Sequence, residues 1–320
     1  MRLFEHPDFS QLMIRAASHF RGQGLREALI EKDYYVTEAL RSIAAAYPDK
    51  IIFKGGTSLS KGWNLIQRFS EDIDIFLDPA AFDPELGRNA IDRELKKLRD
   101  IVKAHPGLTL EKDGSNTTGG FGRSDAFNYD QIFSTSGEIA SRFLVETGTG
   151  SGREPTVTVN LQSYLGRFLQ ENGTPLGTQD EASFPMKLLH FRRTFVEKMF
   201  AIHGKVELFK RNKRPIGSYA RHYYDLYQLS SQGEVVKMLR SPEYDSIKSD
   251  YDEISKKLFS KNYFYPKDMK FSKSDALFPD SQLSASLSVA YESQCSSLCY
   301  RPYPKWVQVL ERFEELRDIL

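Results

Sequence analysis

The chain has 320 residues, enough for one large or two medium domains with a substantial hydrophobic core. Its apolar content of 40%, mean hydropathy of −0.47 and net charge of +1 are ordinary for a soluble globular protein. These values argue against a membrane protein and against a globally basic nucleic-acid binder. The N-terminus carries acids and a histidine where a signal peptide is apolar, so we expect a cytoplasmic protein, monomeric by default.

The first fifty residues predict helices. Apolar residues recur at three- and four-residue spacing in segments 9–20 and 25–47, as they do on the buried face of an amphipathic helix. The run IIFKGG (51–56) is β-branched and aromatic and ends in glycines, which predicts a strand. We expect TSLSKGWNLIQRF (57–69) to form a helix, and EDIDIFLD (71–78) to form the next strand, antiparallel to the first or mixed with it.

Two aspartates, Asp72 and Asp74, lie one residue apart in that second strand. Side chains of a strand alternate between its faces, so both carboxylates point the same way, with Ile73 and Ile75 on the other face. Paired carboxylate oxygens are ligands for Mg²⁺ bound to the phosphates of a nucleotide. We therefore predict a magnesium site at Asp72 and Asp74; the alternative is two solvent-facing acids on an edge strand.

A glycine pair, Gly55 and Gly56, precedes the predicted helix. Glycines permit a close approach of backbone amides to phosphates at a helix N-terminus. Thr57 and Ser58 can add hydroxyl donors or cap the helix, and both roles are compatible. Lys61 lies one helical turn after Thr57 and can reach a phosphate, or it is a surface lysine. These five residues form our candidate nucleotide-binding set.

The later elements are mixed. Residues 91–102 predict an amphipathic helix, and the Gly-, Ser- and Asn-rich residues 112–125 predict a long loop. Strands are expected next, and a break at 170–180 is the best candidate domain boundary. Beyond it the pattern is mostly helical. The strands cover 128–134, 141–148 and 156–165, and the helices cover 186–203, 218–231 and 306–320.

Positive charge is concentrated between Met186 and Asp225. This stretch contains ten Lys and Arg residues and three acids. The local excess of seven positive charges can attract phosphates. A solvated charged face is the alternative. Cys295 and Cys299 are spaced as a helical i,i+4 pair, and two ligands alone make a poor metal site, so we expect reduced, partly buried thiols.

The outline is an α+β fold, in which a mixed sheet flanked by helices is followed by a helical C-terminal domain. Strand, helix and strand, with acids on the second strand, is the layout of the DNA polymerase beta nucleotidyltransferase core. We expect residues 1–175 to hold the N-terminal helices and this core. Residues 176–320 are expected to form a mainly helical domain that completes the active site.

Four segments strengthen this interpretation, because together they resemble the AbiEii/AbiGii nucleotidyltransferase toxin family of bacterial abortive-infection and toxin–antitoxin systems, which includes the MenT-type toxins. The segments are EKDYYVTEAL (31–40), FKGGTSLSKGWNLIQRFSEDIDIFL (53–77), RTFVEKMFAIH (193–203) and RHYYDLYQL (221–229). The polymerase-beta-type superfamily usually has Gly-Ser before the helix, where this chain has Gly55-Gly56 followed by Thr57 and Ser58.

The resemblance implies further site residues. It makes Lys198 a phosphate-contacting lysine, where the residues alone also allow a lysine that snorkels along an apolar stripe. It makes Asp225 an active-site acid, where an i,i+4 ion pair with Arg221 is the alternative. It places a third metal-binding acid near Glu146, with Asp125 and Asp130 as rivals. The candidate acceptor-binding residues are Arg192, Arg193, Arg214, Arg221 and His222.

The resemblance thus implies a Mg²⁺-dependent nucleotidyltransferase toxin. It transfers a nucleotidyl group from an NTP to an acceptor hydroxyl, for which we favour the 3′ end of tRNA, and so blocks translation until a cognate antitoxin protein neutralises it. Transfer to a protein or small molecule, kinase-like phosphoryl transfer and non-catalytic NTP binding are the alternatives.

Overall fold

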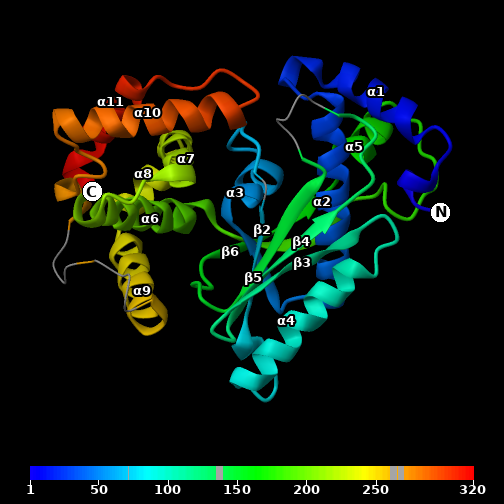
Figure 1. The fold of residues 1–320 in the computed structure, drawn as a ribbon, viewed down its shortest axis with the longest axis horizontal. Coiled ribbons are helices and arrows are strands. Elements are labelled where there is room, and N and C mark those ends of the chain that lie inside the picture. Colours follow the sequence, from blue (N-terminus) through cyan, green and yellow to red (C-terminus); the bar gives the residue numbers. More distant parts are fainter. Residues whose placement is uncertain (71, 135–139, 260–264, 266–269) are drawn as a thin grey trace. The chain divides into compact units, whose positions relative to one another are not determined.

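The computed structural model describes residues 1–70, 72–134, 140–259, 265 and 270–320 (Figure 1). The chain forms two compact units. The first comprises Met1–Gly62, Ser70–Thr149 and Thr156–Leu189, and the second comprises Trp63–Phe69, Gly150–Pro155 and His190–Leu320. The division falls at Leu189–His190, so the chain remains in the first unit through the boundary expected at 170–180.

The first unit is built on a seven-stranded mixed sheet of described residues, with strand order β3-β4-β5-β2-β1-β7-β6. Strands β1 and β2 are antiparallel, whereas β2 pairs with β5 and β1 with β7 in parallel. The two central strands are β-branched and aromatic, as buried strands favour. The strands are β1 Ile51–Lys54, β2 Asp72–Leu77, β3 Thr109–Thr118, β4 Gly122–Asn128, β5 Arg142–Gly148, β6 Thr156–Leu161 and β7 Phe184–Leu189.

Helices pack on this sheet. Helix α4 contacts β4 and β5, and α2 contacts both β7 and α4, while α1 and α5 pack on α2 (Figure 1). The expected helices at 9–20, 25–47 and 91–102 are confirmed as α1, α2 and α4. The helices of this unit are α1 Phe9–His19, α2 Glu27–Ala46, the single turn α3 Gly55–Thr57, α4 Arg88–Lys103 and α5 Tyr164–Glu171.

Three local predictions in this unit were wrong. The helix expected over 57–69 ends early, because α3 and one wide turn over Ser58–Gly62 are followed by irregular chain in which Asn64 has a φ of 52°. The loop expected over 112–125 is the β3–β4 hairpin, whose polar strand β3 is exposed at the sheet edge. The strand expected over 128–134 is irregular beyond Asn128.

Two strand predictions were only partly right. The segment 156–165 is β6 as far as Leu161, and α5 begins at Tyr164 behind the N-cap Ser163. The strand expected over 71–78 is confirmed for Asp72–Leu77, whereas Glu71 lies outside the described residues.

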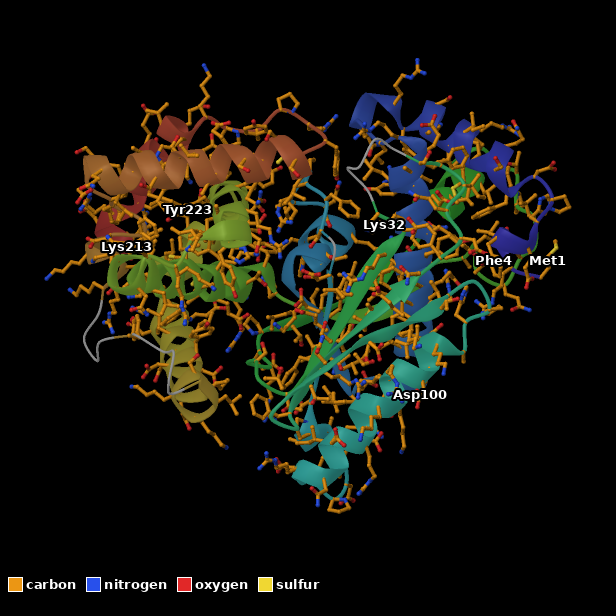
Figure 2. All side chains as sticks on the ribbon, viewed as in Figure 1. Met1, Phe4, Lys32, Asp100, Lys213 and Tyr223 are labelled. Atoms are coloured by element: carbon orange, nitrogen blue, oxygen red, sulfur yellow. The ribbon has the colours of Figure 1, made fainter. Side chains whose placement is uncertain are left out.

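The second unit is helical in its described part. The predicted helix at 186–203 begins late, because Met186–Leu189 belong to β7 and α6 starts after the N-cap His190. The predictions at 218–231 and 306–320 are confirmed as α7 and α11. Tyr223 of α7, labelled in Figure 2, is buried, and its ring packs edge-on against that of Trp306 of α11. The helices are α6 Phe191–Asn212, α7 Arg221–Ser230, α8 Gly233–Leu239, α9 Pro242–Phe259, α10 Ser281–Leu298 and α11 Trp306–Leu316.

Candidate functional site

The strand register brings three carboxylates to one face of the sheet. Asp74 of β2 lies directly beside Glu146 of the parallel strand β5, and Asp72 lies two residues earlier on the same face. The alternate residues Ile73 and Val145 are buried on the other face. Two adjacent strands thus present the predicted acids in one row, as the alternation of side chains requires.

The register also decides between Glu146 and its rivals. Asp125 lies opposite Val145 in the β4–β5 pair, so its side chain points to the face opposite Glu146. There it forms a buried ion pair with Arg123 at 2.6 Å. Asp130 is exposed in the chain after β4. Of the three acids, Glu146 alone shares the face of Asp72 and Asp74.

One residue of this row was missed in the sequence. Lys54, the last residue of β1, lies directly opposite Asp74 in the antiparallel β1–β2 pair and therefore shares its face. It is half-buried. The strand pattern IIFK contained the signal, since the residue that precedes the glycine turn lies at the end of its strand.

These donors fit Mg²⁺ by chemistry. Within the described residues, no group of three or more His, Cys, Asp or Glu side chains is arranged to hold a metal ion. Mg²⁺ is typically held by one or two carboxylates, with waters and substrate phosphates as its other ligands, so a ready three-carboxylate cluster is not required. Asp72 and Asp74 suffice for this mode of binding, and Glu146 flanks them.

The glycine turn meets the acid pair directly. Gly55 has a φ of +75°, and a Cβ at this position would lie 1.9 Å from Oδ2 of Asp74. Both observations demand glycine, because other residues disfavour this φ and no side-chain atom fits the space. The backbone of the turn after β1 therefore lies against the Asp74 carboxylate, and this contact explains why glycine is needed here.

The two hydroxyls of the turn are turned inward. Thr57 is buried and its Oγ1 donates to the carbonyl oxygen of Asp72, while Ser58 Oγ donates to the Gly55 carbonyl oxygen at 2.9 Å. The N-cap position of α3 is Lys54 and its C-cap is Ser58, so neither Thr57 nor Ser58 is the N-cap of this helix. Their hydrogen bonds tie the turn to itself and to the start of β2, which fixes the backbone beside the acids.

Lys61 is held inside the first unit. Its Nζ donates to Asp33 Oδ1 of α2 at 2.6 Å and to the carbonyl oxygen of Gln162 at 3.1 Å. The second oxygen of Asp33 accepts the backbone N–H of Tyr164, at the start of α5, at 2.8 Å. Lys61 thus connects the segment that follows the Gly55–Gly56 turn to α2 and α5. This anchoring is neither of the two roles expected from the sequence.

The second unit holds a buried cluster of charged side chains around Asp225. Arg68 donates hydrogen bonds to both carboxylate oxygens of Asp225, from Nε to Oδ1 at 2.6 Å and from Nη2 to Oδ2 at 2.7 Å. Lys198 of α6 places its Nζ 2.7 Å from the same Oδ2. Asp225 of α7 is fully buried, and its partners are these two cations rather than Arg221 at i−4. The local i,i+4 pair expected as an alternative is therefore replaced by a long-range one.

Burial and the oppositely charged neighbours act in opposite directions on the pKa values of Asp225 and Lys198. Burial alone disfavours the carboxylate, but the adjacent Arg68 and Lys198 hold the pKa of Asp225 well below its usual range. For Lys198, burial and the nearby Arg68 lower the pKa of the ammonium, and Asp225 opposes them. The cluster thus contains two cations and one anion, and Lys198 is its more readily deprotonated cation.

His222 completes the cluster. Its Nδ1 lies 3.1 Å from Lys198 Nζ and 3.6 Å from Asp225 Oδ2, which is too long for a hydrogen bond. Burial and the charge of Lys198 lower the pKa of His222 to about 3. The imidazole is therefore neutral, and Nδ1 accepts from the ammonium while Nε2 carries the proton. This placement differs from the acceptor contact expected for His222. We call Arg68, Lys198, His222 and Asp225 the Lys198 cluster.

The other predicted acceptor residues differ in their surroundings. Arg193 is buried and bonded to Glu197 at 2.9 Å, to Asp250 and to the Glu154 carbonyl oxygen, so it is a structural residue. Arg192 forms ion pairs with two acids, from Nη1 to Glu234 Oε2 at 3.4 Å and from Nε to Glu243 Oε1 at 3.3 Å.

The remaining acceptor candidates are accessible. Arg214 is exposed and follows Lys213, the C-cap of α6 that is labelled in Figure 2. Arg221 is partly exposed at the start of α7. The two cysteines are free thiols, with Cys295 buried and Cys299 partly so, as expected.

Paired carboxylates beside a glycine turn, on a mixed sheet followed by a helical unit, are the arrangement expected of an enzyme that works on nucleoside phosphates. The profile of the nucleotidyl transferase AbiEii toxin family, of type IV toxin–antitoxin systems, matches residues 38–283. The chain therefore belongs to this family and is a nucleotidyltransferase. The predicted family and fold class are confirmed.

Two solved structures are similar to the chain. The MenT4 nucleotidyltransferase toxin of Mycobacterium tuberculosis H37Rv has 13% identity and a TM-score of 0.47, with 96% of each chain covered. A candidate nucleotidyltransferase of H. pylori has 15% identity and a TM-score of 0.29, over 81% of this chain and 94% of its own. No curated protein matches the chain at a significant level. No described helix is long and apolar enough to span a membrane.

Proposed function

We propose that the protein transfers a nucleoside monophosphate from an NTP to an acceptor hydroxyl and releases pyrophosphate. The observation that carries the proposal is the alignment of Asp72, Asp74 and Glu146 on one sheet face, against the Gly55 turn. Membership of a nucleotidyltransferase family is consistent with it.

In this proposal the chain's own residues position the NTP and neutralise the negative charge of its phosphates. The carboxylates of Asp72 and Asp74 hold Mg²⁺, assisted by Glu146, and the backbone of the Gly55–Gly56 turn receives phosphate oxygens. The metal, when bound, supplies charge neutralisation and a lowered pKa for the attacking hydroxyl. The hydroxyl oxygen bonds to the α-phosphorus as the bond from that phosphorus to the bridging oxygen breaks. The proton goes to solvent, and Lys198 stabilises the negative charge on the phosphates.

RNA is the acceptor that we propose, specifically the 3′ end of tRNA. The support is the basic stretch before Asp225, whose exposed members Lys210, Arg211, Lys213 and Arg214 lie at and just beyond the C-terminal end of α6. Such a run suits a phosphodiester backbone. Addition of a nucleotide to that 3′ end blocks aminoacylation, so the protein acts as a toxin in the cytoplasm until its antitoxin counteracts it.

Labelled nucleotides test the reaction class. The purified protein is incubated with α-³²P- or γ-³²P-labelled NTPs, MgCl₂, total tRNA and total cell protein. We expect label in tRNA from α-³²P and not from γ-³²P. Label from γ-³²P alone contradicts the proposal and indicates phosphoryl transfer, and label in protein alone changes the acceptor.

Substitutions test the metal assignment in the same assay. We expect Asp72→Asn and Asp74→Asn to lower labelling by at least about 100-fold, because each removes a charged metal ligand. Asp78→Asn is the matched control, since Asp78 follows the same strand and its carboxylate accepts from the Ala80 backbone N–H at 3.1 Å. Labelling by Asp72→Asn at the control rate removes Asp72 from the site.

A further inference from the structure

We propose that Arg68 and His222 are positioning residues that hold the Lys198 ammonium in one orientation, with one N–H left for a phosphate oxygen. This inference rests on the proposed nucleotidyl transfer and extends it to two side chains in the second unit. Neither residue donates to the ligand in this account. Each acts through Lys198, Arg68 by way of Asp225 and His222 directly.

Arg68 fixes the carboxylate that Lys198 uses. Its two hydrogen bonds, at 2.6 and 2.7 Å, take both oxygens of Asp225, and a third from Nη1 goes to the Phe69 carbonyl oxygen at 2.9 Å. A planar guanidinium bonded in this way cannot rotate, and neither can the carboxylate it grips. Both side chains are fully buried. Oδ2 of Asp225 is thus a fixed acceptor for Lys198.

His222 supplies the second fixed acceptor. An ammonium has three donors, and within the described part of the chain Lys198 Nζ has two hydrogen-bond acceptors, Asp225 Oδ2 at 2.7 Å and His222 Nδ1 at 3.1 Å. Two anchored donors determine the direction of the third. A lysine normally keeps several rotamers, so this double attachment removes freedom that a transition state would otherwise have to remove.

The charge of the cluster indicates what the third donor binds. Arg68 and Lys198 carry two positive charges and Asp225 one negative charge, with His222 neutral. A buried surplus of one positive charge is costly unless an anion compensates it. A phosphate oxygen is such an anion, and nucleotidyl transfer brings three phosphates.

The charged and titratable groups around Lys198 come from three places besides α6. Helix α7 contributes Asp225, His222 and Arg221, the segment 63–69 contributes Arg68, and Cys299 at the end of α10 lies beside Arg68. Of these, Arg68 and Arg221 disfavour the ammonium and Asp225 favours it. Removing Arg68 should therefore raise the pKa of Lys198, and removing Asp225 should lower it.

The test compares Arg68→Gln with Arg123→Gln. Arg123 is the matched control, because it is another buried arginine that donates two hydrogen bonds to the carboxylate of an aspartate. Labelling of tRNA from α-³²P-NTP with MgCl₂ is measured between pH 6 and 10 on equal amounts of folded protein. We expect Arg68→Gln to lower kcat/KM by about 100-fold. Arg68→Lys should recover part of that loss, and Arg123→Gln should keep the wild-type value.

The pH profile separates positioning from mere stability. We expect the alkaline limb of activity to move to higher pH in Arg68→Gln and to lower pH in Asp225→Asn. His222→Asn, whose Oδ1 can replace Nδ1 as an acceptor, should retain more activity than His222→Ala. Equal losses in Arg68→Gln and Arg123→Gln, or an alkaline limb at the same pH in all variants, would overturn the inference.

A second readout does not depend on catalysis. The rate at which acetic anhydride acylates Lys198, measured by mass spectrometry across the same pH range, reports its ionisation in the free protein. Opposite shifts of this curve in Arg68→Gln and Asp225→Asn support the positioning of Lys198 even if the wild type labels no acceptor. In that case the proposed nucleotidyl transfer is rejected, and the proposed positioning of Lys198 by Arg68 and His222 is retained. Unshifted curves reject the inference whatever the labelling shows.

Discussion

Two buried arginine–aspartate pairs lie in the two units of this molecule and share one geometry. Arg68 and Asp225 are joined in the helical unit, and Arg123 and Asp125 on the sheet, each through Nε and one terminal nitrogen at 2.6–2.7 Å. All four side chains are nearly inaccessible to solvent. Distance and burial alone therefore cannot tell which pair serves a site.

The neighbours of the two pairs differ. Asp125 accepts a further hydrogen bond from the neutral hydroxyl of Ser115 at 2.6 Å, so that pair is balanced in charge. Asp225 accepts from the ammonium of Lys198, which leaves its cluster with one positive charge in excess. Folding alone has no use for a surplus buried charge. An unbalanced buried cluster is thus a better sign of a ligand site than a buried ion pair.

Asparagine at the two aspartates tests this difference with the largest effect. Breaking a buried pair by removing one partner costs about 3–5 kcal/mol of unfolding free energy. We expect Asp225→Asn to cost more than Asp125→Asn, because it leaves two buried cations uncompensated instead of one. Urea unfolding at pH 7 measures both changes. An equal or smaller loss in Asp225→Asn would mean that Lys198 sheds its proton in that variant.

The sequence predicted the acids better than it predicted their neighbours. Strand alternation placed Asp72 and Asp74 on one face from local spacing alone, and the register confirms it. The β3–β4 hairpin was missed because its edge strand is exposed on both faces, so Lys112 to Thr118 show no alternation of apolar residues. The start of α6 was missed because the apolar residues of β7 run into those of the helix without a break.

Arg68 escaped prediction for a different reason. Its partner Asp225 is 157 residues away, and no local pattern reports such a pair. Local spacing suggested Arg221 at i−4 instead, as helix geometry allows. The basic count in the same stretch was equally ambiguous, because Arg193 and Lys198 point inward to acids while Arg214 is exposed. Composition counts charges and does not distinguish paired ones from accessible ones.

Methionine at Lys198 separates activity from stability. Lys198→Met has a similar volume and leaves Arg68 and Asp225 as a balanced pair, like Arg123 and Asp125. We expect the unfolding free energy to change by less than about 1.5 kcal/mol. Labelling should fall by about 100- to 1,000-fold, because a charged donor to the phosphates is lost. Retained labelling would remove Lys198 from the reaction, and a large loss of stability would mean that its charge serves folding.

The smallest expected effect concerns histidine and pH. His222 has a pKa of about 3 when folded and an ordinary value near 6.5 when unfolded, so between these values the unfolded chain binds the extra proton. Its stabilising contribution is therefore complete above pH 6.5 and is lost as the pH falls toward 3. His222→Asn should flatten the decline of unfolding free energy between pH 7 and 5, measured by urea unfolding.

His105 provides the matched comparison for this pH effect. It is buried in the first unit, and burial and the charge of Arg2 lower its pKa to about 4. His105→Asn should flatten the same decline in stability, because the same proton is excluded from the folded state. It should leave the pH profile of labelling unchanged, whereas His222→Asn alters the hydrogen bond to Lys198. If both variants change that profile equally, the profile reports folding and His222 has no special relation to Lys198.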